Sequence, residues 1–307
     1  MICESYKFIN PKDNHKIAVY KWYSKTQEIK GVIHIVHGAS EHAKRYQHFA
    51  RFLVSQGYVV FAHDHRGHGH SISKAIPIGD FGGDGGFLNL ISDTLIINQH
   101  IQKSYPHCKM IMIGHSMGSF VARYFTILFS DKIDKLILSG TGYQPPALLN
   151  ASILVINAIL LVTDGTQPNT LINKIMFGPL NRKFLKENDR SAWLSRCQKE
   201  RETFNNDKLC GQQFTGYTYR ELVRGMHFIN QSSNFNKILT KNLPILIISG
   251  EYDPVGNYGK GVLKTYKLFK QTGCTNVTLK IYPKMRHEIF NEINKSIVYK
   301  EIIRWLN

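Results

Sequence analysis

No stretch of this chain is apolar for long enough to cross a bilayer. The longest apolar run spans only residues 151–163 and contains the polar Asn157, whereas a transmembrane helix needs about 20 apolar residues. The first residues also lack the basic start and the apolar segment of a secretory signal. These absences predict a soluble, globular protein of the cytoplasm, large enough at 307 residues for a full hydrophobic core.

Cysteine and acidic residues are scarce as well. The five cysteines are odd in number and form no C-x-x-C pair, which favours free thiols in a reducing compartment. Lysine and arginine number 39 against 22 aspartates and glutamates, a net charge of +17. The positive charges are spread along the chain without a basic block or a nucleic-acid motif, so we expect no nucleic-acid partner. The charge would instead favour a weak association with a membrane surface, and the sequence favours no particular oligomeric state.

What the chain does contain is a series of short, β-branched apolar runs. Their near-continuous hydrophobicity is typical of strands covered on both faces, as in a parallel sheet. Segments with helical periodicity alternate with them, which predicts an α/β fold with a mostly parallel central sheet flanked by helices. The predicted strands are residues 16–22, 31–36, 58–62, 109–113, 135–139, 243–249 and 277–282, and the predicted helices are 41–56, 88–105, 116–129, 259–270 and a terminal helix up to Trp305.

The alternation of strands and helices stops near residue 141 and resumes at Leu243. The sequence therefore predicts a core made of residues 1–140 and 241–307, with a helical cap, residues 141–240, inserted between the strands near 135–139 and 243–249. Inside the insertion the helix-like segments are 151–162, 171–185, 190–205 and 218–229.

A serine stands between two glycines directly after a predicted strand. Ser116 follows the strand 109–113, is flanked by Gly114 and Gly118, and precedes an apolar helix. This is the context of a nucleophile elbow, in which a sharp strand-to-helix turn exposes the serine hydroxyl. The glycines would let the backbone fold tightly around a strained residue. A chance G-x-S-x-G is the alternative.

A serine nucleophile needs a base and an acid. His287 follows the last predicted strand, Asp253 follows the strand before it, and the chain order Ser116, Asp253, His287 is the one expected for such an elbow. Asp253 would accept the Nδ1–H of His287 and steady the imidazolium. Glu251 is the second candidate for the acid. Alternatively, Asp253 starts a turn and His287 caps a helix.

Attack on a carbonyl also needs donors for the developing oxyanion. The backbone N–H of Met117, at the start of the elbow helix, is one candidate. The loop after the strand 31–36 should supply the other, and we expect it to be the N–H of Ala39. His37 and Gly38 would shape that loop, and His37 is a weaker candidate for the base.

Four histidines crowd into the eight residues from His63 to His70, which raises the alternative of a metal site. A known metallohydrolase pattern needs an aspartate where this chain has Gly67, and no distant ligands with matching strand context are evident. We therefore predict no metal. Asp64, Arg66 and His68 would instead tie the neighbouring turns together.

Together these motifs resemble the α/β-hydrolase superfamily, and within it the monoglyceride lipase and lysophospholipase branch, which is classified beside the serine aminopeptidases. The resemblance implies the triad and oxyanion donors named above, a cap formed by the insertion, a small lipid-ester substrate and no cofactor. Its motifs are HGASEH from His37 with Arg45 and Tyr46, DHRGHGHS from Asp64, GHSMG from Gly114, GEYDPV from Gly250 and MRHEIF from Met285.

Two other functions remain open at this stage. A serine peptidase that removes N-terminal residues would use the same triad, and would need an acidic anchor in the cap for the substrate amine. A non-catalytic binding protein could keep the same scaffold. The apolar helix 153–162 would line an acyl tunnel, dock on a lipid surface, or simply pack on the core. The candidate acidic anchors are Glu187, Asp189, Glu200, Glu202 and Asp207.

Overall fold

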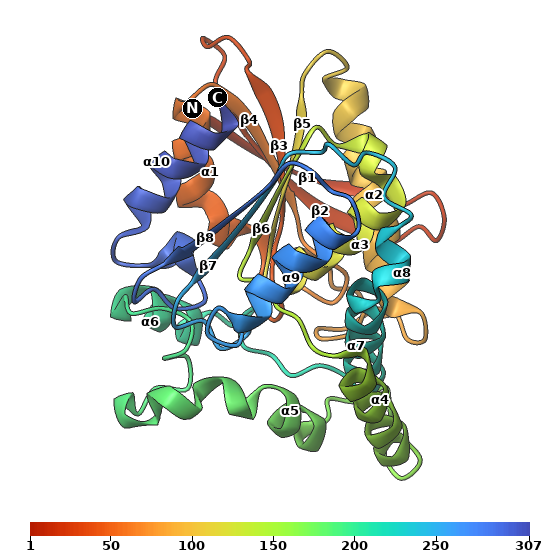
Figure 1. The fold of residues 1–307 in the computed structure, drawn as a ribbon. Coiled ribbons are helices and arrows are strands. Elements are labelled where there is room, and N and C mark those ends of the chain that lie inside the picture. The colour runs from red at the N-terminus through yellow and green to blue at the C-terminus, as the bar shows by residue number, and fades with distance from the viewer.

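One eight-stranded sheet forms the centre of the protein (Figure 1). The computed structural model describes all 307 residues, and the strand order is β1-β2-β4-β3-β5-β6-β7-β8. The strands are β1 (Ile2–Ile9), β2 (Lys16–Tyr23), β3 (Gly31–Val36), β4 (Tyr58–His63), β5 (Met110–His115), β6 (Lys135–Ser139), β7 (Ile245–Gly250) and β8 (Val277–Tyr282).

The sheet is parallel from β4 through β8, which confirms the expected mostly parallel architecture. Strands β1 and β2 form an antiparallel hairpin, and β2 pairs antiparallel with β4. Strand β1 was not predicted. It lies at the edge of the sheet with most of its residues exposed, including Glu4, Ser5 and Lys7. An edge strand lacks the continuous apolar run by which the buried strands are recognised.

Helices cover both faces of the sheet (Figure 1). Ile33 and Ile35 of β3 pack with helices α1 (Gln47–Ser55) and α10 (Lys295–Leu306) on one face, whereas Val32 and Val36 pack with the helices of the other face. That second face carries α2 (Gly86–Ser104), α3 (Met117–Phe129) and α9 (Lys260–Gln271). Burial on both faces explains why the inner strands show no polar alternation.

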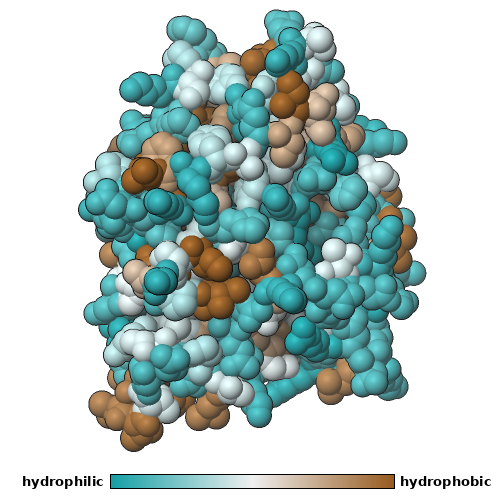
Figure 2. Space-filling view, turned by 180° about the vertical axis from the view of Figure 1, so that it is seen from behind, coloured by the Kyte–Doolittle hydropathy of each residue, from teal (hydrophilic) through white to brown (hydrophobic).

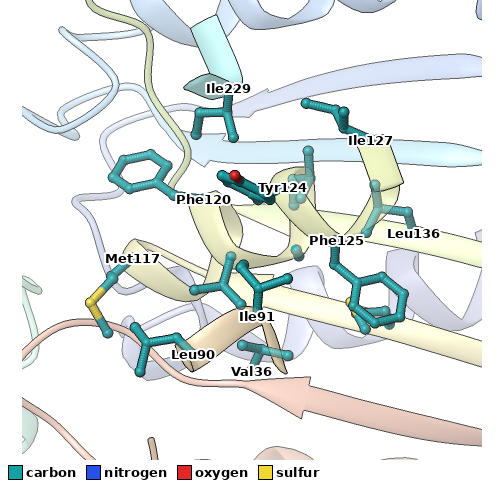
Figure 3. Packing of buried hydrophobic residues seen from close by; sticks show 14 of the residues in the cluster. Val36, Leu90, Ile91, Met117, Phe120, Tyr124, Phe125, Ile127, Leu136 and Ile229 are labelled. Carbon is teal, nitrogen blue, oxygen red and sulfur yellow. The ribbon is translucent and has the colours of Figure 1, made fainter. Parts of the chain in front are cut away.

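Helix α3 is the best-buried helix of the second face (Figure 3). Phe120 and Tyr124 point toward Ile229 of helix α7 (Gly216–Asn230), while Leu90 and Ile91 of α2 lie on the other side of α3. This packing fixes the direction in which α3 leaves β5, and Ser116 lies at that junction.

The residues between β6 and β7 form several helices, of which α4 (Pro146–Leu160), α5 (Thr170–Met176) and α6 (Gln198–Asn206) lie beyond one end of the sheet, toward the bottom of Figure 1. Helix α7 packs on α2, α3 and α4, which joins the insertion to the rest of the chain. None of the helices combines the length and the apolar composition that a bilayer crossing requires. The other helices between β6 and β7 are α7 and α8 (Ser232–Phe235), with the 3-10 segment η4 (Gly178–Glu187) between α5 and α6.

Three predicted helices are shorter or divided in the structure. The segment 171–185 breaks after Met176 into α5 and η4, because Pro179 has no N–H for a continuing helix and disfavours α geometry in the residue before it. The segment 190–205 becomes helical only at Gln198. The segment 41–56 begins as a 3-10 turn, η1 (Ala43–Tyr46), before α1. The other 3-10 turns are η2 (Gly69–Ser71), η3 (Ser130–Lys132) and η5 (Ile289–Asn291).

Candidate active site

Ser116 occupies the turn between β5 and α3. Its backbone has φ 52° and ψ −122°, a conformation that non-glycine residues rarely adopt, and its side chain is only half-buried. A Cβ on Gly114 would stand 2.4 Å from the Gly118 carbonyl oxygen, and one on Gly118 would stand 2.1 Å from that of Val36. Neither position has room for a side chain. The two glycines therefore permit the close backbone approach that holds the strained serine in place.

His287 and Asp253 meet beneath the same end of the sheet. The His287 Nδ1–H donates to Asp253 Oδ1 at 2.9 Å, and both side chains are buried. Asp253 follows β7 and accepts two further hydrogen bonds, from the Val255 N–H at 2.8 Å and the Ser249 hydroxyl at 3.1 Å. These donors fix the carboxylate, and the carboxylate fixes the tautomer of His287, leaving Nε2 free to accept a proton.

Glu251, the second candidate for the acid, lies elsewhere. Its side chain is exposed and accepts a hydrogen bond from the Lys284 N–H at 2.8 Å, and it makes no contact with His287. Burial by itself would lower the pKa of His287, but the Asp253 carboxylate outweighs it and raises that pKa above the usual 6.5. The imidazole is thus a stronger base than a free histidine.

His287 and Ser116 line one cavity, although no hydrogen bond joins them in this structure. Such bonds are often longer before substrate binds. The ring of His115, the residue before the serine, lies 4.7 Å from the ring of His287, centroid to centroid. Burial, and then repulsion from His287, lowers the pKa of His115 to about 4. His115 therefore stays neutral at neutral pH and leaves the proton to His287.

Two backbone N–H groups border the cavity beside Ser116. Ala39 N–H donates to no atom of the protein, and Met117 is the first residue of α3, where a helix leaves its N–H groups without a partner. The loop that carries Ala39 is held by Gly38, whose N–H donates to Glu41 Oε1 at 2.6 Å. A helix N-terminus with a second free N–H close by suits a developing negative charge.

His37 and His68 brace this loop with their ring nitrogens. His37 Nδ1–H donates to the Gly38 carbonyl at 2.8 Å, and its Nε2 accepts the His65 N–H at 2.9 Å. His68 Nε2 accepts the Ser40 N–H at 3.2 Å. Burial, followed by the neighbouring His65 and His68, holds the pKa of His37 well below its usual range. Both ring nitrogens of His37 are occupied by backbone groups, one in this loop and one in the segment after β4, so His37 is not available as a base.

Asp64 and Arg66 tie the turns behind the loop. Asp64 accepts hydrogen bonds from the Ala43 N–H at 2.8 Å and the His70 N–H at 2.7 Å. Arg66 donates from Nε and one terminal nitrogen to the two oxygens of Asp93, at 2.6 and 2.8 Å. The histidine-rich segment thus serves as a hydrogen-bonded scaffold beside the site.

One group of side chains could supply three metal ligands, and it lies outside that segment. Donor atoms of His42, Asp207 and Cys210 lie within 4.8 Å of one another. His42 Nε2, however, already donates to Asp207 at 2.8 Å. Burial raises the pKa of the Cys210 thiol, which disfavours the thiolate that a metal would need. The group is accounted for as a hydrogen-bonded contact between the loop after β3 and the insertion.

A family model described as serine aminopeptidase, S33, matches residues 27–294 of the chain. The chain belongs to this family. This S33 chain is 27% identical to human monoglyceride lipase over 94% of its own length and 86% of that protein. It is 23% identical to a probable lysophospholipase L2 from Haemophilus influenzae, over 98% of its own length and 90% of that protein.

Among solved structures, a carboxyl esterase from Bacillus coagulans in complex with glycerol matches this S33 chain with a TM-score of 0.88 and 26% identity. The match covers 100% of this chain and 98% of the other. The comparisons confirm the α/β-hydrolase fold expected from the sequence motifs, with a mostly parallel eight-stranded sheet flanked by helices.

The cavity of the S33 chain measures about 510 Å³ and lies between the end of the sheet and the insertion. This volume is in the range of small-molecule sites. Trp193 of the insertion lies over His287, with ring centroids 5.0 Å apart. No motif identified the lining residues, because they come from separate helices and turns. The apolar ones from the insertion are Met176, Phe177, Leu180, Trp193, Leu194, Phe204, Leu222 and Met226.

The cavity wall also includes two acidic residues for which no sequence motif predicted a role. Glu41 and Glu288 are the acidic residues of the lining, and both are hydrogen-bonded to the guanidinium of Arg45. Glu41 and Arg45 stand in the HGASEH motif region and Glu288 follows His287, so their motif positions were the available signal. The pairing of Arg45 with Glu288, which are 243 residues apart, had no signal in the sequence.

Proposed function

We propose that this chain is a serine hydrolase that cleaves the carboxylic ester of a lipid, a monoacylglycerol or a lysophospholipid. The observation that carries the proposal is a strained serine and a buried His287–Asp253 pair on one largely apolar cavity. The names of the relatives, monoglyceride lipase and lysophospholipase, support the same class of substrate.

In the proposed reaction, Ser116 Oγ attacks the ester carbonyl while His287 Nε2 takes the hydroxyl proton. The N–H groups of Ala39 and Met117 hold the oxyanion of the tetrahedral intermediate. When that intermediate collapses, His287 gives its proton to the leaving alcohol and the acyl group stays on Ser116. Water then attacks the acyl-enzyme with the same base, and the fatty acid leaves. Asp253 keeps its charge throughout, and no metal or organic cofactor takes part.

We propose that residues 141–240 act as a cap over a core of residues 1–140 and 241–307. The apolar side chains of the insertion in the cavity wall suit an acyl chain. Helix α4 and its end expose Leu154, Val155, Leu161 and Val162, at 70, 51, 86 and 84%. Figure 2 shows apolar surface at the lower left, where α4 lies after the half turn. Together with the +17 charge, this surface supports a weak association with lipid.

The geometry favours an ester over a peptide with a free N-terminus. A substrate amine would need an unpaired carboxylate at the cavity, and both lining carboxylates share Arg45. The five anchors considered from the sequence are outside the cavity lining and are engaged elsewhere. Glu187 pairs with Arg286, Asp189 with Arg201, Glu200 with Lys295, Glu202 with Gln198 and Asp207 with His42.

A hydrolysis panel with the purified protein tests the proposal. We expect cleavage of monoacylglycerols, lysophospholipids and p-nitrophenyl esters, and little cleavage of aminoacyl amides. Faster turnover of the amides than of the esters would favour the peptidase. No turnover of any member, together with no adduct from a fluorophosphonate probe, would favour a non-catalytic binding protein.

A further inference from the structure

Arg45 is buried between two carboxylates that come from distant parts of the chain. One terminal nitrogen donates to Glu41 and to Glu288, at 2.6 Å each, and the other donates to the second oxygen of Glu288 at 2.7 Å. The three side chains are 5 to 7% exposed. Removing three charges from water costs free energy, which only good geometry offsets. The group is therefore a specific junction rather than a surface ion pair.

The two carboxylates lead directly to opposite sides of the reaction centre. Glu41 accepts the Gly38 N–H at 2.6 Å, and Gly38 precedes the proposed oxyanion donor Ala39. Glu288 follows the proposed base His287 in the chain. The guanidinium thus connects the loop that would hold the oxyanion to the loop that would hold the base.

The insertion meets this junction from a third direction. The ring of Phe204, in α6, lies over the Arg45 guanidinium, with its centroid 4.9 Å from the central carbon. The Glu288 N–H donates to the Leu194 carbonyl at 2.7 Å. The guanidinium of Arg45 can contact the Phe204 ring and the two carboxylates at once, since its plane stacks on the ring while its edge donates to the carboxylates.

We propose that Arg45 is a positioning residue that fixes the distance between the Ala39 N–H and the His287 imidazole, with Glu288 as its anchor on the side of the base. The inference rests on the proposed function, because this distance matters only if the two groups act on one substrate. A misplacement of about 1 Å costs on the order of 100-fold in rate. A fork that donates to both loops prevents such a shift.

Glu288 also acts on His287 through its charge. The charged or titratable groups facing the imidazole are Asp253 from the loop after β7, His115 from β5, Glu41 from the loop after β3, and Glu288 itself. Asp253 is the main negative neighbour, and Glu288 and Glu41 add to it in raising the pKa of His287. Removing the charge of Glu288 therefore lowers the pKa of the base.

The test compares Arg45→Lys, Glu288→Gln and the control Arg196→Lys in the full chain. Arg196 is also paired, with Glu292 at 2.9 Å, and also links the insertion to the loop after His287, but it does not contact Glu41, Arg45 or Glu288. Each variant is measured for kcat and KM on a p-nitrophenyl ester between pH 5 and 9, for its rate of labelling by a fluorophosphonate, and for its melting temperature.

For Arg45→Lys we expect kcat to fall by about 100-fold with KM nearly unchanged, because a lysine keeps the charge but cannot bridge both loops. For Glu288→Gln we expect the acidic limb of kcat/KM to move to lower pH. A purely structural role would lower activity evenly and leave that midpoint in place. Arg196→Lys should keep both the kcat and the midpoint of the wild type.

Wild-type kcat in folded Arg45→Lys, or an unmoved acidic limb in Glu288→Gln, would overturn the inference. If Arg45→Lys does not fold, the kcat of the near-isosteric Glu288→Gln at its pH optimum decides, because the amide also breaks the paired hydrogen bonds with Arg45. In that variant a fall in kcat with KM nearly unchanged supports the positioning role, and a wild-type kcat contradicts it. Labelling by the fluorophosphonate separates this inference from the proposed substrate class. A wild type that is labelled rapidly but cleaves no lipid ester would contradict the substrate class, while the labelling rates of the variants would still test the positioning role.

Discussion

The end of the sheet and the insertion that covers it differ in the interactions that hold their cavity-lining residues. At the end of the sheet, Ser116, Asp253 and His287 are held by backbone turns and short hydrogen bonds, and each follows a parallel strand. In the insertion, the cavity wall is a set of apolar side chains from several helices and turns, and large apolar residues remain exposed on α4. The proposed reaction needs fixed angles and distances, whereas the proposed binding of an acyl chain needs only apolar surface of sufficient extent.

The largest effect that would test this contrast is the loss of the proposed nucleophile, Ser116. Ser116→Ala should lower kcat on a p-nitrophenyl ester by about a million-fold, the scale seen when the serine of a hydrolase triad is removed. The melting temperature should stay close to that of the wild type, because the side chain is half-buried and bridges no other element. Appreciable residual turnover in the folded variant would place the chemistry outside the elbow.

The loss of the proposed acid, Asp253, should have the second largest effect. Asp253→Asn should lower kcat by about 10,000-fold, since the asparagine favours the wrong tautomer of His287. Loss of the carboxylate also lowers the pKa of His287, so the residual activity should titrate at lower pH than the wild type. Glu251→Gln is the matched control and should keep both the rate and the profile, because Glu251 is exposed and contacts the Lys284 backbone. A larger loss of kcat in Glu251→Gln than in Asp253→Asn would make Glu251 the acid instead of Asp253.

A smaller effect compares glycines from the two regions. Gly118→Ala should lower the free energy of unfolding by about 1–3 kcal/mol, because the new methyl group would stand 2.1 Å from the Val36 carbonyl oxygen. Gly178→Ala, in the insertion, meets nothing within 4 Å and should change it by less than about 0.5 kcal/mol. Urea unfolding of both variants measures the difference. Equal losses would contradict the contrast between a rigid elbow and an open insertion.

The smallest effect concerns the exposed face of α4. Leu161→Asp should weaken binding to vesicles that contain anionic lipid, by about tenfold, without changing kcat on a water-soluble ester. Leu88→Asp, on α2, is the control, because Leu88 is also exposed, at 54%, but lies on the core. Cosedimentation with vesicles measures the binding. An equal loss of vesicle binding in both variants would mean that the added negative charge, and not the position on α4, weakens the binding.

Sequence reasoning was strongest where one residue type is tied to one backbone geometry. Gly114 and Gly118 are required by close contacts that no other residue permits, and the six inner strands are apolar on both faces, so the elbow and these strands were predictable. Strand β8, at the opposite edge of the sheet from β1, was also predictable because apolar Val277, Leu279 and Ile281 recur at every second position. Strand β1 was not predicted because it lies at an exposed edge, where polar residues such as Glu4 and Lys7 interrupt the apolar run.

The remainder depends on contacts between distant segments. The Arg45–Glu288 pair joins residues 243 positions apart, and no periodicity or motif spacing encodes such a distance. The same holds for Trp193 over His287. The break after Met176 was predictable from Pro179, which ends a regular helix, although the apolar periodicity of 171–185 indicates a continuous one.

The most direct test of the account is to map the adduct of a fluorophosphonate probe by mass spectrometry in the wild type and in His287→Gln. We predict one adduct per chain, on the peptide that contains Ser116, and a labelling rate at least about 1,000-fold lower in the folded variant. An adduct on another residue, or equal labelling of the two proteins, would contradict the claim that His287 activates Ser116.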